Sequence, residues 1–229
     1  MGNLVFSKGT EFVTGVTDLL TGIILIPLIF VLMSKGKGKE ITGKWNAFLL
    51  SLSLGNIGGA VVHCVRWSVG THNVMWLFLY IVMFAIVVFF LRLALFRFYP
   101  GKFGSALYKT AFYLLTAVSY AAIILYQFTG REQYSIRIFS VYAAMFALPA
   151  FLIYAWNGVK HGVKSGIMLL VCIIPQIFGL YFQLVRKGSF TLFVTFDHDG
   201  IYHLCLLFTV LMCYFAALFD IGSRDEKNN

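Results

Sequence analysis

Long apolar runs separated by short polar segments dominate the pattern of this chain. A helix that spans a membrane needs about 20 mostly apolar residues, and seven stretches meet this requirement. They are residues 13–33, 46–69, 74–96, 106–128, 135–156, 163–185 and 200–220. The pattern predicts an all-α polytopic membrane protein, a bundle of seven transmembrane helices formed by a single domain over residues 1–229.

Composition supports this prediction. Hydrophobic residues make up 60% of the 229 positions and charged residues 12%, and the mean hydropathy of +0.85 excludes a soluble globular fold. We expect the first apolar run to remain as a spanning helix, because neither the basic segment nor the cleavage site of a signal peptide flanks it. The short connections predict that successive helices are neighbours.

The ends and faces of the predicted helices carry further signals. Four small residues between positions 55 and 60 predict a face of the second helix that a neighbouring helix approaches closely. Tryptophan prefers the headgroup layer of a membrane. The four tryptophans all lie near predicted helix ends: Trp45, Trp67, Trp76 and Trp156.

The basic residues predict an orientation. The net charge is +9, and the first, third and fifth loops and the C-terminal tail hold twelve of the 18 Lys and Arg residues. The positive-inside rule therefore predicts a cytoplasmic C-terminus and an N-terminus on the other side of the membrane. Since topology explains the charge, we expect no nucleic-acid partner. The expected partners are membrane lipids and, through the large apolar surface, other membrane proteins.

Ionisable and amide side chains gather near the opposite, non-cytoplasmic face. Asp18, His63, Gln183 and His203 belong to four predicted helices, and at 1.5 Å per residue all four fall within roughly 10 Å of that face. Ionisable groups inside a span are costly, so they face the bundle interior, pair with one another or bind a ligand. The sequence predicts that these side chains converge on one site.

The segment 196–203 adds acids and imidazoles at the mouth of the seventh predicted helix. Asp199 and His203 are four residues apart and share a helix face, where a carboxylate and an imidazole form half of a zinc or iron site. Asp199 is equally suited to cap the helix without a metal. His198 is either a further ligand or a loop residue in the headgroup layer.

His63 and Asp18 each have two interpretations. His63 lies in an apolar segment and is either a structural residue or a metal ligand. Its match in depth to His203 favours the ligand. Asp18 is either a ligand or the ion-pair partner of Arg66, because an unpaired carboxylate at this depth is costly. The candidate metal ligands are His63, His198, Asp199 and His203, and the candidate catalytic carboxylates are Asp18 and Asp199.

The residues present restrict which other cofactors the chain could bind. Retinal would need a buried lysine, and residues 201–219 contain none. Bis-imidazole ligation of haem needs only two inward histidines from different helices, so haem held by His63 and His203 stays an alternative. The four cysteines show no CxxC spacing and are expected to be small buried hydrophobic residues.

The segment 197–204, together with Thr17, Asp18 and His63, makes the chain similar to the superfamily of alkaline ceramidases, adiponectin and progestin receptors and related membrane hydrolases, and within it to a divergent bacterial branch. This resemblance implies seven helices, a zinc ion held by one histidine of the second helix and two of the seventh, and hydrolysis of a lipid amide by zinc-activated water. His63 and His203 match two ligand positions, and Asp199 stands at the third.

Two functions of different classes follow. The first is a zinc-dependent intramembrane hydrolase of a lipid amide or ester, with Zn²⁺ held near the non-cytoplasmic face by His63, His203 and either Asp199 or Asp18. The second is a non-catalytic membrane subunit or sensor whose polar cluster is a hydrogen-bonded network. Two departures from the superfamily favour the second function: Gly59 replaces a serine, and the third predicted helix lacks an aspartate.

Overall fold

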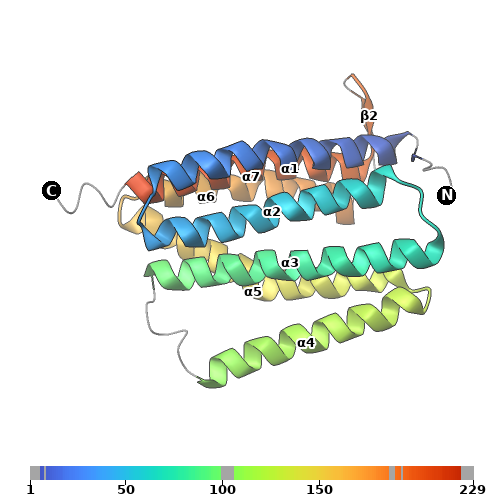
Figure 1. Cartoon of the computed structure of the whole chain (residues 1–229), viewed down its shortest axis with the longest axis horizontal. Helices are drawn as coiled ribbons and strands as arrows, with labels where there is room; N and C mark the ends of the chain where they lie inside the picture. The colour runs from blue at the N-terminus through green and yellow to red at the C-terminus, as the bar shows by residue number, and fades with distance from the viewer. Residues whose placement is uncertain (1–5, 8, 99–105, 186–188, 192, 223–229) are drawn as a thin grey trace.

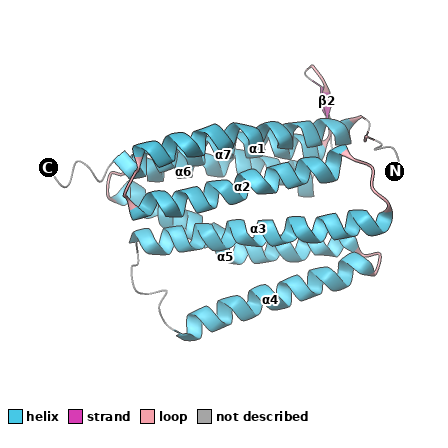
Figure 2. Cartoon of the chain, viewed as in Figure 1, coloured by secondary structure: helices cyan, strands magenta, loops and turns pink. Residues whose placement is uncertain are grey.

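The computed structural model describes residues 6–7, 9–98, 106–185, 189–191 and 193–222. Within these residues the chain forms seven α-helices and one short hairpin (Figures 1 and 2). The helices are α1 (Thr10–Lys35), α2 (Glu40–Cys64), α3 (Val69–Phe98), α4 (Ala106–Phe128), α5 (Glu132–Lys160), α6 (Lys164–Leu184) and α7 (His198–Gly222). The hairpin consists of the antiparallel strands β1 (Phe190–Thr191) and β2 (Thr195–Phe196).

Each of the seven described helices is long and apolar enough to cross a membrane. A helix satisfies its backbone hydrogen bonds internally, which is what a lipid environment requires of a spanning segment. The predicted all-α bundle of seven transmembrane helices is therefore confirmed, and the protein is an integral membrane protein.

The helices lie side by side in one bundle (Figure 1). α1 packs against α2 and α7, α6 packs against α7, and α4 contacts mainly α5 at the edge. We call the end at which α1, α3 and α7 begin and α2 ends the His203 end. The other end, at which α1, α3 and α7 end and α2 begins, is the Asp220 end.

Glycines let α1 and α2 approach each other closely. A Cβ atom at Gly22 would lie 2.6 Å from Ile57 Cγ1 and 2.9 Å from the Ser53 carbonyl oxygen, and one at Gly15 would lie 2.4 Å from Cys64 Sγ. Ser53 Oγ also donates a hydrogen bond of 2.8 Å to the Gly22 carbonyl oxygen. Small residues at helix interfaces permit this spacing in membranes, and it brings the start of α1 against the end of α2.

The connection between α2 and α3 lies five residues earlier than predicted, because α2 ends at Cys64 rather than at 69 and α3 begins at Val69 rather than at 74. Val65 leaves the helix in an extended conformation, φ −115° and ψ 132°, and forms an isolated bridge with Phe6. The Ser7 amide donates a hydrogen bond of 2.8 Å to the Cys64 carbonyl oxygen. The segment before α1 thus satisfies a free carbonyl at the end of α2.

A buried carboxylate joins four helices at the Asp220 end. Asp220 of α7 is 1% exposed and accepts hydrogen bonds from Trp45 Nε1 at 3.1 Å, from Arg97 Nε at 2.8 Å and from the Tyr154 hydroxyl. Trp45 is fully buried, so its predicted place in the headgroup layer is wrong. Its indole N–H is satisfied inside the bundle by the carboxylate instead.

Candidate metal centre

Threonines surround Asp18 on the buried face of α1. Asp18, Thr14, Thr17 and Thr21 are all buried, and their spacing of three and four residues places them on one side of the helix. The hydroxyls of Thr17 and Thr21 donate hydrogen bonds of 2.7 and 2.8 Å to carbonyl oxygens of the preceding turn. These two hydroxyls are satisfied within α1, which leaves the carboxylate to interact with groups of other helices.

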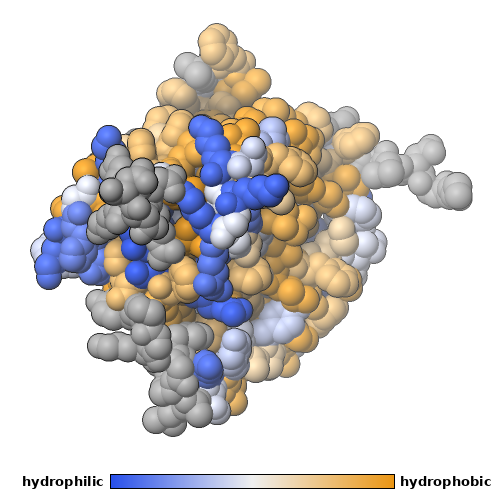
Figure 3. All heavy atoms as spheres, turned by 60° about the vertical axis from the view of Figure 1, so that its left-hand side comes forward, coloured by the Kyte–Doolittle hydropathy of each residue, from blue (hydrophilic) through white to orange (hydrophobic). Residues whose placement is uncertain are grey.

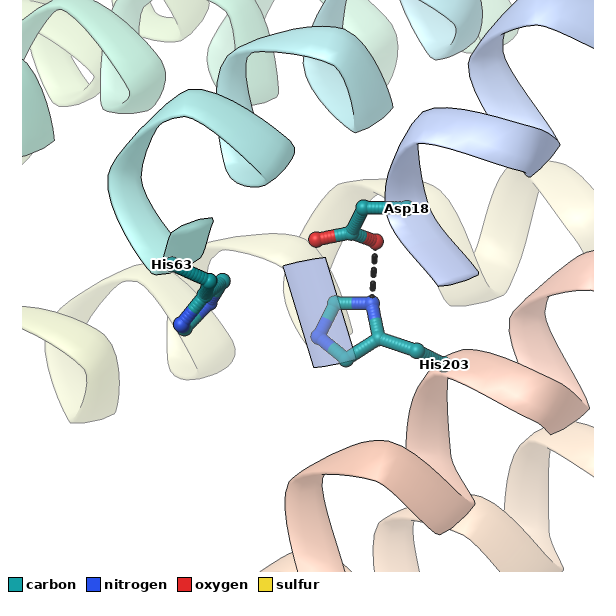
Figure 4. A group of neighbouring side chains, drawn as sticks. All are labelled: Asp18, His63 and His203. Carbon is teal, nitrogen blue, oxygen red and sulfur yellow. Dashed lines mark ion pairs between the residues drawn. The ribbon is translucent and has the colours of Figure 1, made fainter. Parts of the chain in front are cut away.

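Asp18, His63 and His203 converge at the His203 end from α1, α2 and α7 (Figure 4). One potential ligand atom of each residue lies within 4.8 Å of those of the other two. Asp18 Oδ1 is 2.5 Å from His203 Nδ1, and the ring centroids of His63 and His203 are 5.9 Å apart. The side chain of Asp18 is 2% exposed and that of His203 is 15% exposed, so the group lies inside the bundle.

Several buried polar atoms of this group lack a hydrogen-bond partner. Asp18 Oδ2 has none, and neither has Thr14 Oγ1 on the same face of α1. His203 Nδ1 is at ion-pair distance from Asp18 Oδ1, but the contact does not have the geometry of a hydrogen bond. A buried acceptor without a donor is costly. A bound cation would remove this cost.

Gly59 of α2 makes room for the carboxylate. A Cβ atom at this position would lie 2.5 Å from Asp18 Oδ2 and 3.2 Å from Asp18 Cγ. Two imidazoles and one carboxylate are the donor set of several catalytic zinc sites and of non-haem iron(II) sites, which keep a coordination position open. The residues of the group therefore fit such an ion.

Trp76 of α3 contacts the group but was expected only as a headgroup residue. Its ring packs edge-on against His63, with a centroid distance of 5.8 Å. Its indole Nε1 donates a hydrogen bond of 3.0 Å to His72 Nε2, which holds the indole beside His63. The spacing of four residues between His72 and Trp76 on one helix is the sequence signal that could have identified this pair.

A second group of potential ligands lies at the start of α7, where Asp197, His198 and Asp199 also bring their ligand atoms within 4.8 Å of one another. His198 Nε2 is 3.6 Å from Asp199 Oδ2, and their side chains are 30% and 39% exposed. Asp197 caps the helix, because its Oδ1 accepts a hydrogen bond of 2.9 Å from the Gly200 amide. Of the two interpretations of Asp199, the N-cap is wrong: α7 begins at His198, which places Asp199 in the first turn.

The cap also changes the titration of Asp197. Partial burial raises the pKa of this carboxyl, but hydrogen bonds from the Gly200 amide, the Thr10 side chain and the Asp199 amide, together with the charge of nearby His198, outweigh burial and bring the pKa below its usual value. A pKa lowered in the folded state stabilises the fold at neutral pH. This contribution is lost only as the pH falls through the lowered pKa.

The predicted site residues therefore fall into two places. His198 and Asp199 lie in the second group rather than with the other candidate ligands. Within the described residues no ion pair joins Asp18 to Arg66, and the side chain of Gln183 lies outside the described residues. The residues brought together in the first group are the buried Asp18 and the partly buried His63 and His203.

A family model described as "Family of unknown function (DUF6962)" matches residues 13–220. The chain belongs to this family. The match extends from the first turn of α1 to the last turn of α7, so the metal-ligand candidates of this DUF6962 chain all lie within it. No curated protein and no solved structure matches the chain.

Proposed function

We propose that the protein is a zinc-dependent intramembrane hydrolase that cleaves an amide or ester bond of a lipid. The convergence of buried Asp18 with the partly buried His63 and His203 from three helices carries this proposal. His63 and His203 would hold the ion, and Asp18 would complete the ligand set or orient His203. When bound, zinc lowers the pKa of a coordinated water toward neutrality and polarises a substrate carbonyl.

Asp18 has the features of the proton acceptor. Its Oδ1 contacts His203 Nδ1, and a carboxylate beside one imidazole nitrogen orients the ring and leaves the other nitrogen free to bind a metal. Its Oδ2 is buried and has no hydrogen-bond partner, so it can accept a proton from water at the centre. Asp199 is 39% exposed and belongs to the other group, and we assign it no proton transfer.

The depth of the centre supports a lipid substrate. Asp18 is eight residues from the start of α1 and His203 is five from the start of α7, which places them about 12 and 8 Å from the helix ends. The hydrocarbon core of a bilayer is about 30 Å thick and lies within about 40–45 Å of total thickness. This depth corresponds to the layer just below the headgroups, where the acyl linkages of lipids lie.

Metal analysis of the purified protein tests the ligand set. We expect near-stoichiometric zinc in the wild type and its loss in His63→Ala and in His203→Ala. His161→Ala is the matched control, because His161 is an exposed residue that follows α5 at the Asp220 end, and this variant should keep its zinc. A folded wild type that contains no metal after purification without chelator would overturn the proposal.

Hydrolysis is tested separately from metal content. Wild type in lipid vesicles should release free fatty acid from an N-acyl or O-acyl lipid. Asp18→Asn should lower this rate by about 10² to 10⁴-fold, which is the contribution of general base catalysis. If zinc-loaded protein releases no fatty acid from either lipid class, the protein binds a metal but is not a hydrolase of these lipids.

A non-catalytic subunit or sensor is the second candidate. The observation that favours it is the direct contact between Asp18 and His203, since a paired buried acid and imidazole also serve as a structural link between α1 and α7. If His63→Gln combined with His203→Gln leaves folding and partner association intact while the wild type is free of metal, this candidate is supported. A Soret band in the spectrum of the purified protein would support the haem alternative.

A further inference from the structure

A groove of about 380 Å³ lies between α2 and α3 at the Asp220 end. It is remote from the candidate metal centre, because Glu40 and His63 are 23 residues apart on α2, which is about 35 Å. Hydrophilic side chains gather at this end of the bundle among hydrophobic ones (Figure 3). The groove residues used below are Lys39, Glu40, Gly43, Lys44, Phe89 and Arg92.

Contacts hold the two lysines of the groove in place. Lys44 Nζ is 3.3 Å from Glu40 Oε1 and 5.1 Å from the centroid of the Phe96 ring. Lys39 Nζ donates a hydrogen bond of 3.0 Å to the Ile221 carbonyl oxygen. These contacts fix the positions of both ammonium groups. Among the described residues that line the groove, Glu40 is the one carboxylate.

Arg92 is the third cation of the groove, which carries a formal net charge of +2 from three cations and one carboxylate. It lies six residues before the end of α3, about 9 Å inside that helix end. Arg97 on the same helix is paired with Asp220, whereas within the described part of the chain no carboxylate pairs with Arg92. Arg92 is exposed, and a long basic side chain this close to a helix end extends to the headgroup layer, where lipid phosphates lie.

We propose that this groove binds the phosphate group of an anionic glycerophospholipid. The Arg92 guanidinium offers the paired N–H donors that suit phosphate oxygens, and Lys44 brings a second positive charge to the same groove. Phe89 lines the apolar side of the groove, where the glycerol and the first acyl carbons can lie. Basic pockets between transmembrane helices have this role for anionic headgroups. The site is independent of the proposed hydrolase.

Native mass spectrometry of the full chain in detergent tests this proposal with phosphatidylglycerol and phosphatidylcholine as probes. We expect one phosphatidylglycerol to remain bound per chain and Lys44→Gln/Arg92→Gln to weaken its binding about tenfold or more. Lys109→Gln/Lys160→Gln is the matched control, because it removes the same charge from exposed residues at the same end of the bundle. This control should bind phosphatidylglycerol as the wild type does.

A second variant blocks the groove while it keeps every charge. A Cβ atom at Gly43 would meet nothing within 4 Å, so Gly43→Leu fills open space, and leucine also favours a helix over glycine. We expect this variant to fold with an unchanged or higher melting temperature and to lose phosphatidylglycerol.

Three results would overturn the proposal. The first is an unchanged affinity for phosphatidylglycerol in Gly43→Leu or in Lys44→Gln/Arg92→Gln. The second is an equal loss in Lys109→Gln/Lys160→Gln, which would indicate general surface charge. The third is displacement of the lipid by inorganic phosphate alone, which would indicate a site for free anions.

Discussion

The position of one carboxylate depends on a glycine of the neighbouring helix. Asp18 Oδ2 occupies the space that a side chain at position 59 would need, because a Cβ atom there would lie 2.5 Å away. The donor set of two imidazoles and a carboxylate thus depends on Gly59 and Asp18 together.

Gly59→Ala should weaken zinc binding about tenfold or more, because its methyl group displaces the carboxylate from the two imidazoles. Gly58→Ala is the matched control on the same helix: its Cβ atom would lie 3.2 Å from Leu79 Cδ1, the end of a flexible side chain. Zinc affinity is measured by competition with a chromophoric chelator. Equal zinc affinity in the two variants would show that the carboxylate does not take part in metal binding.

Close contact between α5 and α6 depends on a pair of glycines rather than on side-chain packing. A Cβ atom at Gly158 would lie 2.3 Å from Gly166 Cα, and one at Gly166 would lie 2.4 Å from Gly158 Cα. The turn between them uses Gly162 at φ +65° and a hydrogen bond of 2.6 Å from the Val163 amide to the Gly158 carbonyl oxygen. The contacting atoms are backbone atoms, so they cannot move aside without shifting a whole helix.

Gly166→Ala should therefore destabilise the protein by about 1–3 kcal/mol, as overpacking of a tight contact does. Gly70→Ala is the control, since a Cβ atom there would meet nothing within 4 Å, and alanine in a helix should be neutral or stabilising by up to about 1 kcal/mol. Unfolding in mixed micelles followed by circular dichroism gives both free energies. A Gly166→Ala protein as stable as the wild type would contradict the close backbone contact.

Across the whole bundle, the buried carboxylates Asp18 and Asp220 lie at opposite ends and differ in how completely they are paired. At the His203 end, Asp18 Oδ2 has no hydrogen-bond partner, whereas at the other end Asp220 accepts hydrogen bonds from donors of α2, α3 and α5. A satisfied network of this kind holds helices together, while an incompletely satisfied one is suited to a ligand. The predicted cytoplasmic location of the Asp220 end follows from charge counting and stays a prediction.

Asp220→Ala should destabilise the protein by about 3 kcal/mol, because it leaves a largely buried guanidinium without its partner. Tyr154→Phe, which removes one donor, should cost about 1 kcal/mol, and Tyr113→Phe at a position that is 51% exposed should cost nothing measurable. The measurement is again unfolding in mixed micelles. If zinc binds as proposed, the folded Asp220→Ala protein should contain as much zinc as the wild type, and a lower zinc content would show that the two ends are not independent.

The sequence alone determined the number of spanning helices and the depth of Asp18, His63 and His203. Both are read along the chain, from the length of apolar runs and from the rise of a helix per residue. The imidazole-rich segment 196–203 was likewise visible as a site because ionisable groups are rare beside apolar spans.

Only the tertiary structure decided which groups at that depth meet. Depth does not specify the rotation of a helix about its axis or the identity of its neighbours, since both follow from packing. Packing brought Asp18 rather than Asp199 to the histidines, through the space left by Gly59. It also turned Trp45 inward to Asp220 and formed the basic groove between α2 and α3, because these contacts join residues that are far apart in the chain.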